Sequence, residues 1–131
     1  MPHAELIESL YAALGEGEAG AVRVSEELDP GFELHEFQNG PDAAVYRGRE
    51  GYVAWVRQGF EVFDEATFEP LELTEDGDVV LVSVEVRAVG RGSDLPVTMV
   101  VHHLWDMREG RPWRVRGYLD ADEARAAAGI G

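Results

Sequence analysis

The stretch VTMVVHHLWDMREGRPWRVRGYL, which runs from Val97 to Leu119, decides the fold. Two runs of β-type residues flank a short turn at residues 108–111, and this pattern predicts a β-hairpin. Successive side chains of a strand point to opposite faces, so alternate residues share a face. In the first run, the face turned to the interior carries Met99, Val101, His103, Trp105 and Met107. In the second run, the same alternation turns inward Trp113, Val115 and Leu119.

The interior face of this hairpin carries one group that exchanges a proton near neutral pH, His103. It sits mid-strand with Val101 and Trp105 on either side of it on the same face. Burial among apolar neighbours should disfavour its charged form. His103 is therefore the sharpest catalytic candidate. The alternative is a core histidine whose ring is hydrogen-bonded to a backbone carbonyl.

Length and charge narrow the classes of function. The 131 residues suit a single domain, residues 1–131. The net charge of −15 makes this an acidic protein and disfavours nucleic acid and anionic membranes as partners, because each would meet a repelling field. The absence of cysteine excludes disulfides, thiol nucleophiles and thiolate metal sites. No signal peptide or membrane-spanning run is recognisable, so we expect a cytoplasmic location.

The rest of the chain reads as helices followed by strands. Helical spacing predicts helices, and alternation predicts strands, in this order: helix 6–14, helix 18–28, strand 32–37, helix 49–63, strands 66–73 and 79–89, the hairpin, and a tail helix 120–128. This order predicts an α+β fold, in which the N-terminal helices pack on the concave face of a curved antiparallel β-sheet. Helices across the open side of such a sheet leave a cone-shaped cavity.

Several short strings carry a family resemblance. They are FELH at 32–35, VYRGREG at 45–51, GRGS at 90–93, HLW at 103–105, REGR at 108–111 and YLD at 118–120. Their order resembles that of SnoaL-like proteins of the nuclear-transport-factor-2-like superfamily, which have a cystatin-like α+β cone. That superfamily includes polyketide cyclases, ketosteroid isomerase, limonene epoxide hydrolase, scytalone dehydratase and many non-catalytic proteins. The resemblance is specific for the fold and leaves the function open.

The resemblance also implies roles for individual residues. His103 is similar in position to an acid group that lines the oxyanion site of ketosteroid isomerase. Glu36 falls where isomerase-like members place a general-base carboxylate, whereas His35 matches more closely similar SnoaL-like sequences. Strand alternation would let only one of these two side chains face the cavity. Tyr11 lies one position from the isomerase's helix tyrosine, and we expect it to line the pocket.

Aromatic and apolar residues supply the remaining wall of the predicted cavity, which suits a flat apolar ligand. The residues expected to line it are Tyr11, Trp55, Phe60, Met99, Val101, Trp105 and Trp113. No metal site is expected, because His102 and His103 are adjacent on a strand and point to opposite faces. No phosphate-binding loop is present either, so we expect no cofactor.

The leading hypothesis is a SnoaL-like protein with a pocket for a small, largely apolar ligand. Any catalysis would be cofactor-free proton transfer, of the isomerase, cyclase or dehydratase kind. His103 would act as acid or oxyanion donor, with Glu36 or His35 as base. The alternative is a non-catalytic ligand-binding or dimerisation module of the same fold. Val100 and Leu104, apolar on the outer face of the hairpin, predict a homodimer.

Overall fold

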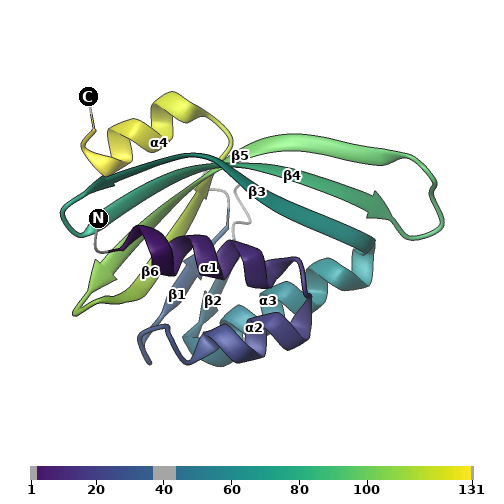
Figure 1. Ribbon diagram of the computed structural model, residues 1–131, viewed down its shortest axis with the longest axis horizontal. Helices are drawn as coiled ribbons and strands as arrows, with labels where there is room; N and C mark the ends of the chain where they lie inside the picture. The colour runs from purple at the N-terminus through teal and green to yellow at the C-terminus, as the bar shows by residue number, and fades with distance from the viewer. Residues whose placement is uncertain (1–2, 37–43, 131) are drawn as a thin grey trace.

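A computed structural model describes residues 3–36 and 44–130 of the chain. The N-terminal half contains three helices and two short strands: α1 (Ala4–Leu14), α2 (Glu18–Ser25), β1 (Glu33–His35), β2 (Val45–Arg47) and α3 (Gly48–Val62). The C-terminal half contains four longer strands and a last helix: β3 (Phe63–Asp76), β4 (Val79–Gly90), β5 (Pro96–Arg108), β6 (Arg111–Tyr118) and α4 (Ala121–Ala128). The hairpin predicted from residues 97–119 is formed by β5 and β6 (Figure 1).

The strands form one six-stranded sheet in the order β2-β1-β6-β5-β4-β3. The four long strands pair antiparallel, as the sequence predicted. The sheet is nevertheless mixed and not purely antiparallel, because β1 pairs parallel with β6. The strand β2 lies in a segment to which the sequence pattern assigned no strand, and it pairs antiparallel with β1. Its three residues are too few to show an alternating pattern.

Helices cover both faces of the curved sheet, with α1, α2 and α3 on one side and α4 on the other (Figure 1). The main core lies under the first three helices, where Leu10 of α1 and Val82 of β4 are fully buried. A second, smaller cluster lies under α4 and consists of Leu81, Leu104, Tyr118 and Ala124. The α+β architecture expected from the sequence is therefore confirmed.

Capping residues define where α4 begins and ends. Asp120 caps its start, because a carboxylate oxygen accepts a hydrogen bond from the backbone N of Asp122 at 2.9 Å. Gly129 ends it in the left-handed region at a φ of 72°, which favours glycine. The helix buries Leu104, which the sequence placed on a free outer face.

A β-bulge interrupts the predicted alternation of β6. Met107 pairs with Pro112, whereas the preceding Asp106 pairs with Arg114, so Trp113 is the extra residue on its strand. The indole of Trp113 lies 5.0 Å from the guanidinium carbon of Arg108 and 4.6 Å from that of Arg114. The bulge thus explains why Trp113 stacks with arginines and does not follow the cavity-facing pattern of the strand.

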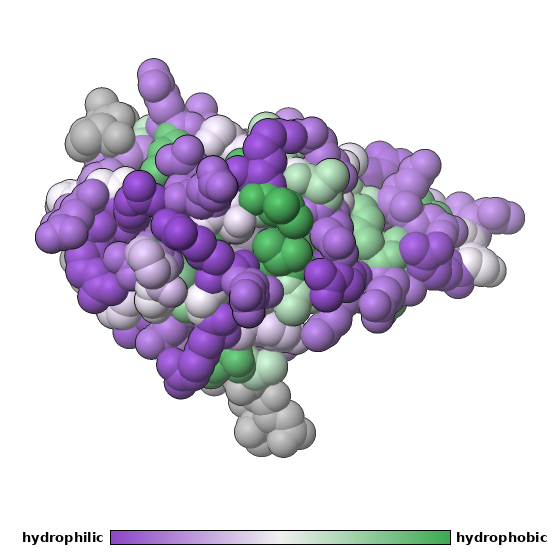
Figure 2. Space-filling model, turned by 90° about the horizontal axis from the view of Figure 1, so that it is seen from below, coloured by the Kyte–Doolittle hydropathy of each residue, from purple (hydrophilic) through white to green (hydrophobic). Residues whose placement is uncertain are grey.

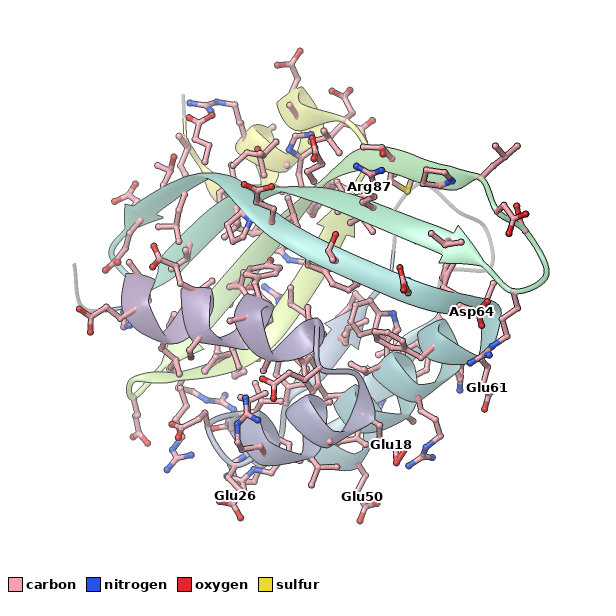
Figure 3. All side chains as sticks on the ribbon, turned by 45° about the vertical axis from the view of Figure 1, so that its right-hand side comes forward. Glu18, Glu26, Glu50, Glu61, Asp64 and Arg87 are labelled. Atoms are coloured by element: carbon pink, nitrogen blue, oxygen red, sulfur yellow. The ribbon has the colours of Figure 1, made fainter. Side chains whose placement is uncertain are left out.

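The outer surface reflects the acidic composition. Glu26, Glu50 and Glu61 project away from the sheet on the side of α2 and α3 (Figure 3). Seen from that side, the surface is mostly hydrophilic and is broken by a small apolar patch (Figure 2). Of the helices in the described part of the chain, none has the length and apolar character needed to cross a membrane.

Candidate functional site

A pocket of about 370 Å³ lies between α3 and the long strands of the sheet. Its volume is within the range of small-molecule sites, and its walls are mainly apolar. The apolar and aromatic wall residues are Leu14, Trp55, Val56, Phe60, Phe63, Ala66, Phe68, Val86, Ala88, Val97, Met99 and Val101. The lining also includes three polar or titratable residues, His103, Glu36 and Tyr46.

A smaller inner pocket of about 60 Å³ adjoins the large one. The two pockets share four lining residues: Leu14, Glu36, Trp55 and His103. The inner pocket adds Tyr11, His35, Tyr52 and Trp105 to the lining. This space is sufficient for water or for the polar end of a ligand. His103 and Glu36 therefore lie at the junction of the two pockets.

A buried hydrogen-bond chain holds His103 in place. Trp105 Nε1 donates to Tyr11 Oη at 2.8 Å, and Tyr11 Oη lies 2.7 Å from His103 Nδ1. The rings of Tyr11 and His103 are almost parallel, at an angle of 4°. Tyr11 is on the buried face of α1, and the alternation of β5 brings His103 and Trp105 to the same side. These two hydrogen bonds thereby hold His103, a catalytic candidate, between α1 and the sheet.

Burial determines the protonation states of His103 and Tyr11. Desolvation is the main cause that lowers the pKa of His103 to about 4, and the charge of neighbouring His102 adds to it. Burial likewise raises the pKa of Tyr11 well above its ordinary value. At neutral pH the site therefore presents an uncharged imidazole and an uncharged phenol. His103 can donate or accept a hydrogen bond there, but it carries no extra proton.

His35 and Glu36 both reach the inner pocket, contrary to the expectation that only one would. The alternation that turns Leu34 inward also turns Glu36 inward, and His35 between them contributes to the lining as well. His35 Nε2 lies 2.8 Å from Glu33 Oε1, which ties the ring to its own strand. Glu36 lines both pockets, and together with burial it raises the pKa of Tyr46. Glu36 is thus the better placed of the two candidate bases.

The structure places most of the predicted wall residues in the lining: Tyr11, Trp55, Phe60, Met99, Val101 and Trp105. Trp113 lies outside both pockets because of the bulge in β6. The wall formed by β3 and β4, including Phe68 and Val86, was not predicted, although the alternating valines of β4 carried the signal. Within residues 3–36 and 44–130, no group of three or more His, Asp or Glu side chains is arranged to hold a metal ion.

Tyr52 also lines the inner pocket, and its hydroxyl allows a first test of the hydrogen bonding described there. Its hydroxyl is buried and has no hydrogen-bond partner among the described residues. A buried hydroxyl without a partner costs about 1–3 kcal/mol. We expect Tyr52→Phe to raise the free energy of unfolding by about 1 kcal/mol. Urea denaturation measures the change.

Tyr11→Phe is the matched control for this test. It removes a phenol oxygen that has two partners, His103 and Trp105, so the free energy of unfolding should fall by about 1–3 kcal/mol. A loss of stability of the same size in Tyr52→Phe would contradict the assignment of an unpaired Tyr52 hydroxyl.

Solved structures share this architecture at low sequence identity. The protein of Jannaschia sp. CCS1 that is described as a SnoaL-like polyketide cyclase is 20% identical, with a TM-score of 0.78 over 99% of this chain and 93% of that one. TerC, co-crystallised with polyporic acid, is 20% identical, with a TM-score of 0.74 over 98% and 99%. A ketosteroid isomerase-like fold from Catenulispora acidiphila DSM 44928, in complex with trimethylamine, is 14% identical, with a TM-score of 0.77 over 97% and 94%.

These likenesses establish a common fold. No curated protein sequence matches the chain. A family model does match, however: the SnoaL-like domain aligns with residues 7–115 and so covers most of the sequence. The matched segment contains most of α1, the strand β1, the helix α3 and the β5 strand that carries His103. The chain belongs to the SnoaL-like domain family.

Proposed function

We propose that this protein binds a small, largely apolar molecule in the pocket under α3 and catalyses a cofactor-free proton transfer on it. One observation carries the proposal: His103 and Glu36 both line both pockets, within walls that are otherwise mainly apolar. An acceptor for a proton and a donor to an oxygen are the two groups that such a reaction needs.

The mechanism follows from the charges of the two groups. The carboxylate of Glu36 takes a proton from a carbon next to a carbonyl group of the substrate. The electron pair of the broken C–H bond moves to the carbonyl oxygen, and neutral His103 donates a hydrogen bond to that oxygen. Where a carbon–carbon double bond of the substrate is conjugated with the enolate, the proton on Glu36 returns to the far carbon of that double bond and the carbonyl group re-forms, which completes an isomerisation. In a cyclase, the enolate carbon attacks a second carbonyl of the same molecule before the protons are redistributed.

Two similar structures support a ligand in such a pocket. TerC was co-crystallised with polyporic acid, and the Catenulispora protein was crystallised in complex with trimethylamine. Their likeness to this chain is one of fold, so the proposal depends mainly on its own residues. The alternative function is a binding module without catalysis, and the apolar character of the walls favours it. Such a module would not accelerate the exchange of carbon-bound protons of its ligand.

The exchange of carbon-bound protons therefore distinguishes the two functions. We expect the protein to accelerate deuterium incorporation next to the carbonyl of a small bicyclic ketone such as 1-indanone in D₂O, followed by NMR. Glu36→Gln should lower the accelerated rate by about 10²–10⁴-fold, because it removes the base. His103→Ala should lower it by about 10²–10³-fold, because it removes the donor to the oxyanion.

Glu50→Gln is the matched control, because it replaces Glu by Gln, as Glu36→Gln does, but on the outer face of α3 (Figure 3). It should keep the wild-type rate. Binding of the ketone without any acceleration of exchange would contradict catalysis and support the binding module. Acceleration that survives in Glu36→Gln would remove Glu36 from the mechanism.

The homodimer stays a prediction, with a smaller interface than the sequence suggested. Leu104 is fully buried under α4, whereas Val100 is 43% exposed and pairs with Glu85 of β4. We expect Val100→Glu to shift sedimentation toward the monomer, while Val22→Glu, an exposed position on α2, leaves the dimer intact. A monomeric wild-type protein at high micromolar concentration would contradict the dimer.

A further inference from the structure

A neutral histidine exists in two tautomers, and the choice between them decides what it offers to a ligand. With the proton on Nε2 the ring donates from Nε2 and accepts at Nδ1, and with the proton on Nδ1 these roles are exchanged. His103 contacts Tyr11 through Nδ1. The nitrogen left for the pocket is therefore a donor in one tautomer and an acceptor in the other.

The direction of the hydrogen-bond chain can be worked out from its far end. The indole N–H of Trp105 can only donate, so the oxygen of Tyr11 accepts from it. Tyr11 has one proton of its own, and among the described residues its hydroxyl has one further partner, Nδ1 of His103. A proton on Nδ1 would make the Tyr11 oxygen accept twice and leave the phenol proton without an acceptor.

Such an orphaned proton would be buried, because Tyr11 is only 1% exposed. Buried donors are almost always paired in folded proteins. The arrangement that pairs every group runs in one direction: Trp105 donates to Tyr11, and Tyr11 donates to Nδ1 of His103. The imidazole proton is then on Nε2, for which the described part of the chain contains no hydrogen-bond partner.

We infer that Tyr11 and Trp105 are positioning residues that hold His103 as the Nε2–H tautomer, so that the pocket selects ligands with a hydrogen-bond-accepting oxygen. A carbonyl, enolate or phenolate oxygen pairs with this N–H. A group that can only donate, such as an indole or pyrrole N–H, does not. This inference deepens the proposed function by giving the ligand's chemical class, and only its ligand part rests on that function.

The tautomer can be measured without any ligand. Two-bond ¹H–¹⁵N correlation spectra of the imidazole rings distinguish a protonated nitrogen from an unprotonated one. In the wild type at pH 7 we expect His103 to show an unprotonated Nδ1 and a protonated Nε2. In Trp105→Phe the Tyr11 oxygen loses its donor and can accept from Nδ1–H instead, while a water in the space left by the indole can accept the phenol proton, so the two tautomers of His103 should become mixed. Tyr11→Phe, which changes the volume little, should give the same mixture.

Trp113→Phe is the matched control, because it makes the same substitution at a tryptophan outside the pocket. It should leave the His103 signals unchanged. His102, whose Nδ1 lies 3.0 Å from Ser83 Oγ on the other side of β5, serves as an internal reference in every variant. Thermal melts of the same samples show whether each variant is folded.

The ligand part is tested with three bicyclic probes of similar size: 1-indanone, which accepts only, indole, which donates only, and indane, which does neither. We expect the ratio of 1-indanone to indane affinity to fall about twofold from the wild type to Trp105→Phe, because an equal mixture of tautomers leaves about half of the molecules with a donor at Nε2. The ratio for indole should not fall.

The results separate the inference from the proposed function. A protonated Nδ1 in the wild type, or an unmixed Nε2–H tautomer in both variants, would overturn the inference whatever the ligands do. A wild type that binds indole in preference to 1-indanone would overturn its ligand part. If no probe binds while the tautomers behave as expected, the positioning roles stand and the proposed ligand-binding function fails.

Discussion

Acidification from pH 6.5 to pH 4 is expected to destabilise the wild-type protein by about 3 kcal/mol more than the His103→Gln variant. Burial and the nearby His102 lower the pKa of His103 from an ordinary value of 6.5 to about 4 in the folded protein. Between these two values the unfolded chain binds a proton that the folded chain does not bind. Stability therefore rises with pH through this window and is lost as the pH falls through it.

Urea denaturation at several pH values between 4 and 7 measures this difference. Glutamine can accept the hydrogen bond from Tyr11 but does not titrate, so the variant lacks the linked proton while His3, His35 and His102 remain. His102→Gln is the comparison: the charge of His102 is the smaller of the two causes that lower the pKa of His103, so most of the pH dependence of the wild type should remain in this variant. Parallel stability curves for the wild type and His103→Gln would show that His103 is not desolvated as described.

Asp106→Ala should lower the free energy of unfolding by about 3–5 kcal/mol, the largest effect expected of any single change considered. The carboxylate of Asp106 is 9% exposed and accepts from Arg114 Nε at 2.8 Å and from Arg116 at 3.4 Å. Its removal takes from Arg116 its ion-pair partner among the described residues and leaves Arg114 with only the charge of Glu33 nearby. The Nε of Arg116 already lacks a partner among the described residues, so no second acceptor compensates.

Asp64→Ala provides the comparison for this effect. Asp64 also pairs with an arginine, Arg91, at 2.8 Å, but both side chains are about half exposed. An exposed pair contributes at most about 1 kcal/mol, so Asp64→Ala should change stability little. Thermal or urea denaturation of the two variants gives the contrast. Equal losses would mean that the burial of Asp106 does not set the strength of its interactions.

The sequence predicted those parts of the site that depend on strand alternation. Period two along β5 placed Met99, Val101 and His103 on one face, and the pocket is lined by that face. It also predicted the α+β fold, because helices followed by an antiparallel meander have few other arrangements. The alternation failed where the backbone departs from a regular strand, at the bulge that displaces Trp113.

The contacts between distant segments were beyond the sequence pattern. Tyr11 and His103 are 92 positions apart, and no local periodicity shows that the hydroxyl of one meets the ring of the other. The parallel pairing of β1 with β6 depends in the same way on how the chain crosses the sheet after α2. The two pockets, and the place of His103 at their junction, follow from such packing and not from any motif.

Gly59 is a position at which the volume of the pocket can change without a change to its polar groups. It lines the large pocket from α3, and a Cβ built there would meet no atom of the described chain within 4 Å. A larger residue at this helical position would take up ligand space and, by replacing glycine, would favour the helix by up to about 1 kcal/mol. The hydrogen-bond chain of Trp105, Tyr11 and His103 belongs to α1 and β5 and would be unaffected. Under the proposed function, the size of the ligand can therefore be changed one residue at a time while Trp105, Tyr11 and His103 keep their hydrogen bonds.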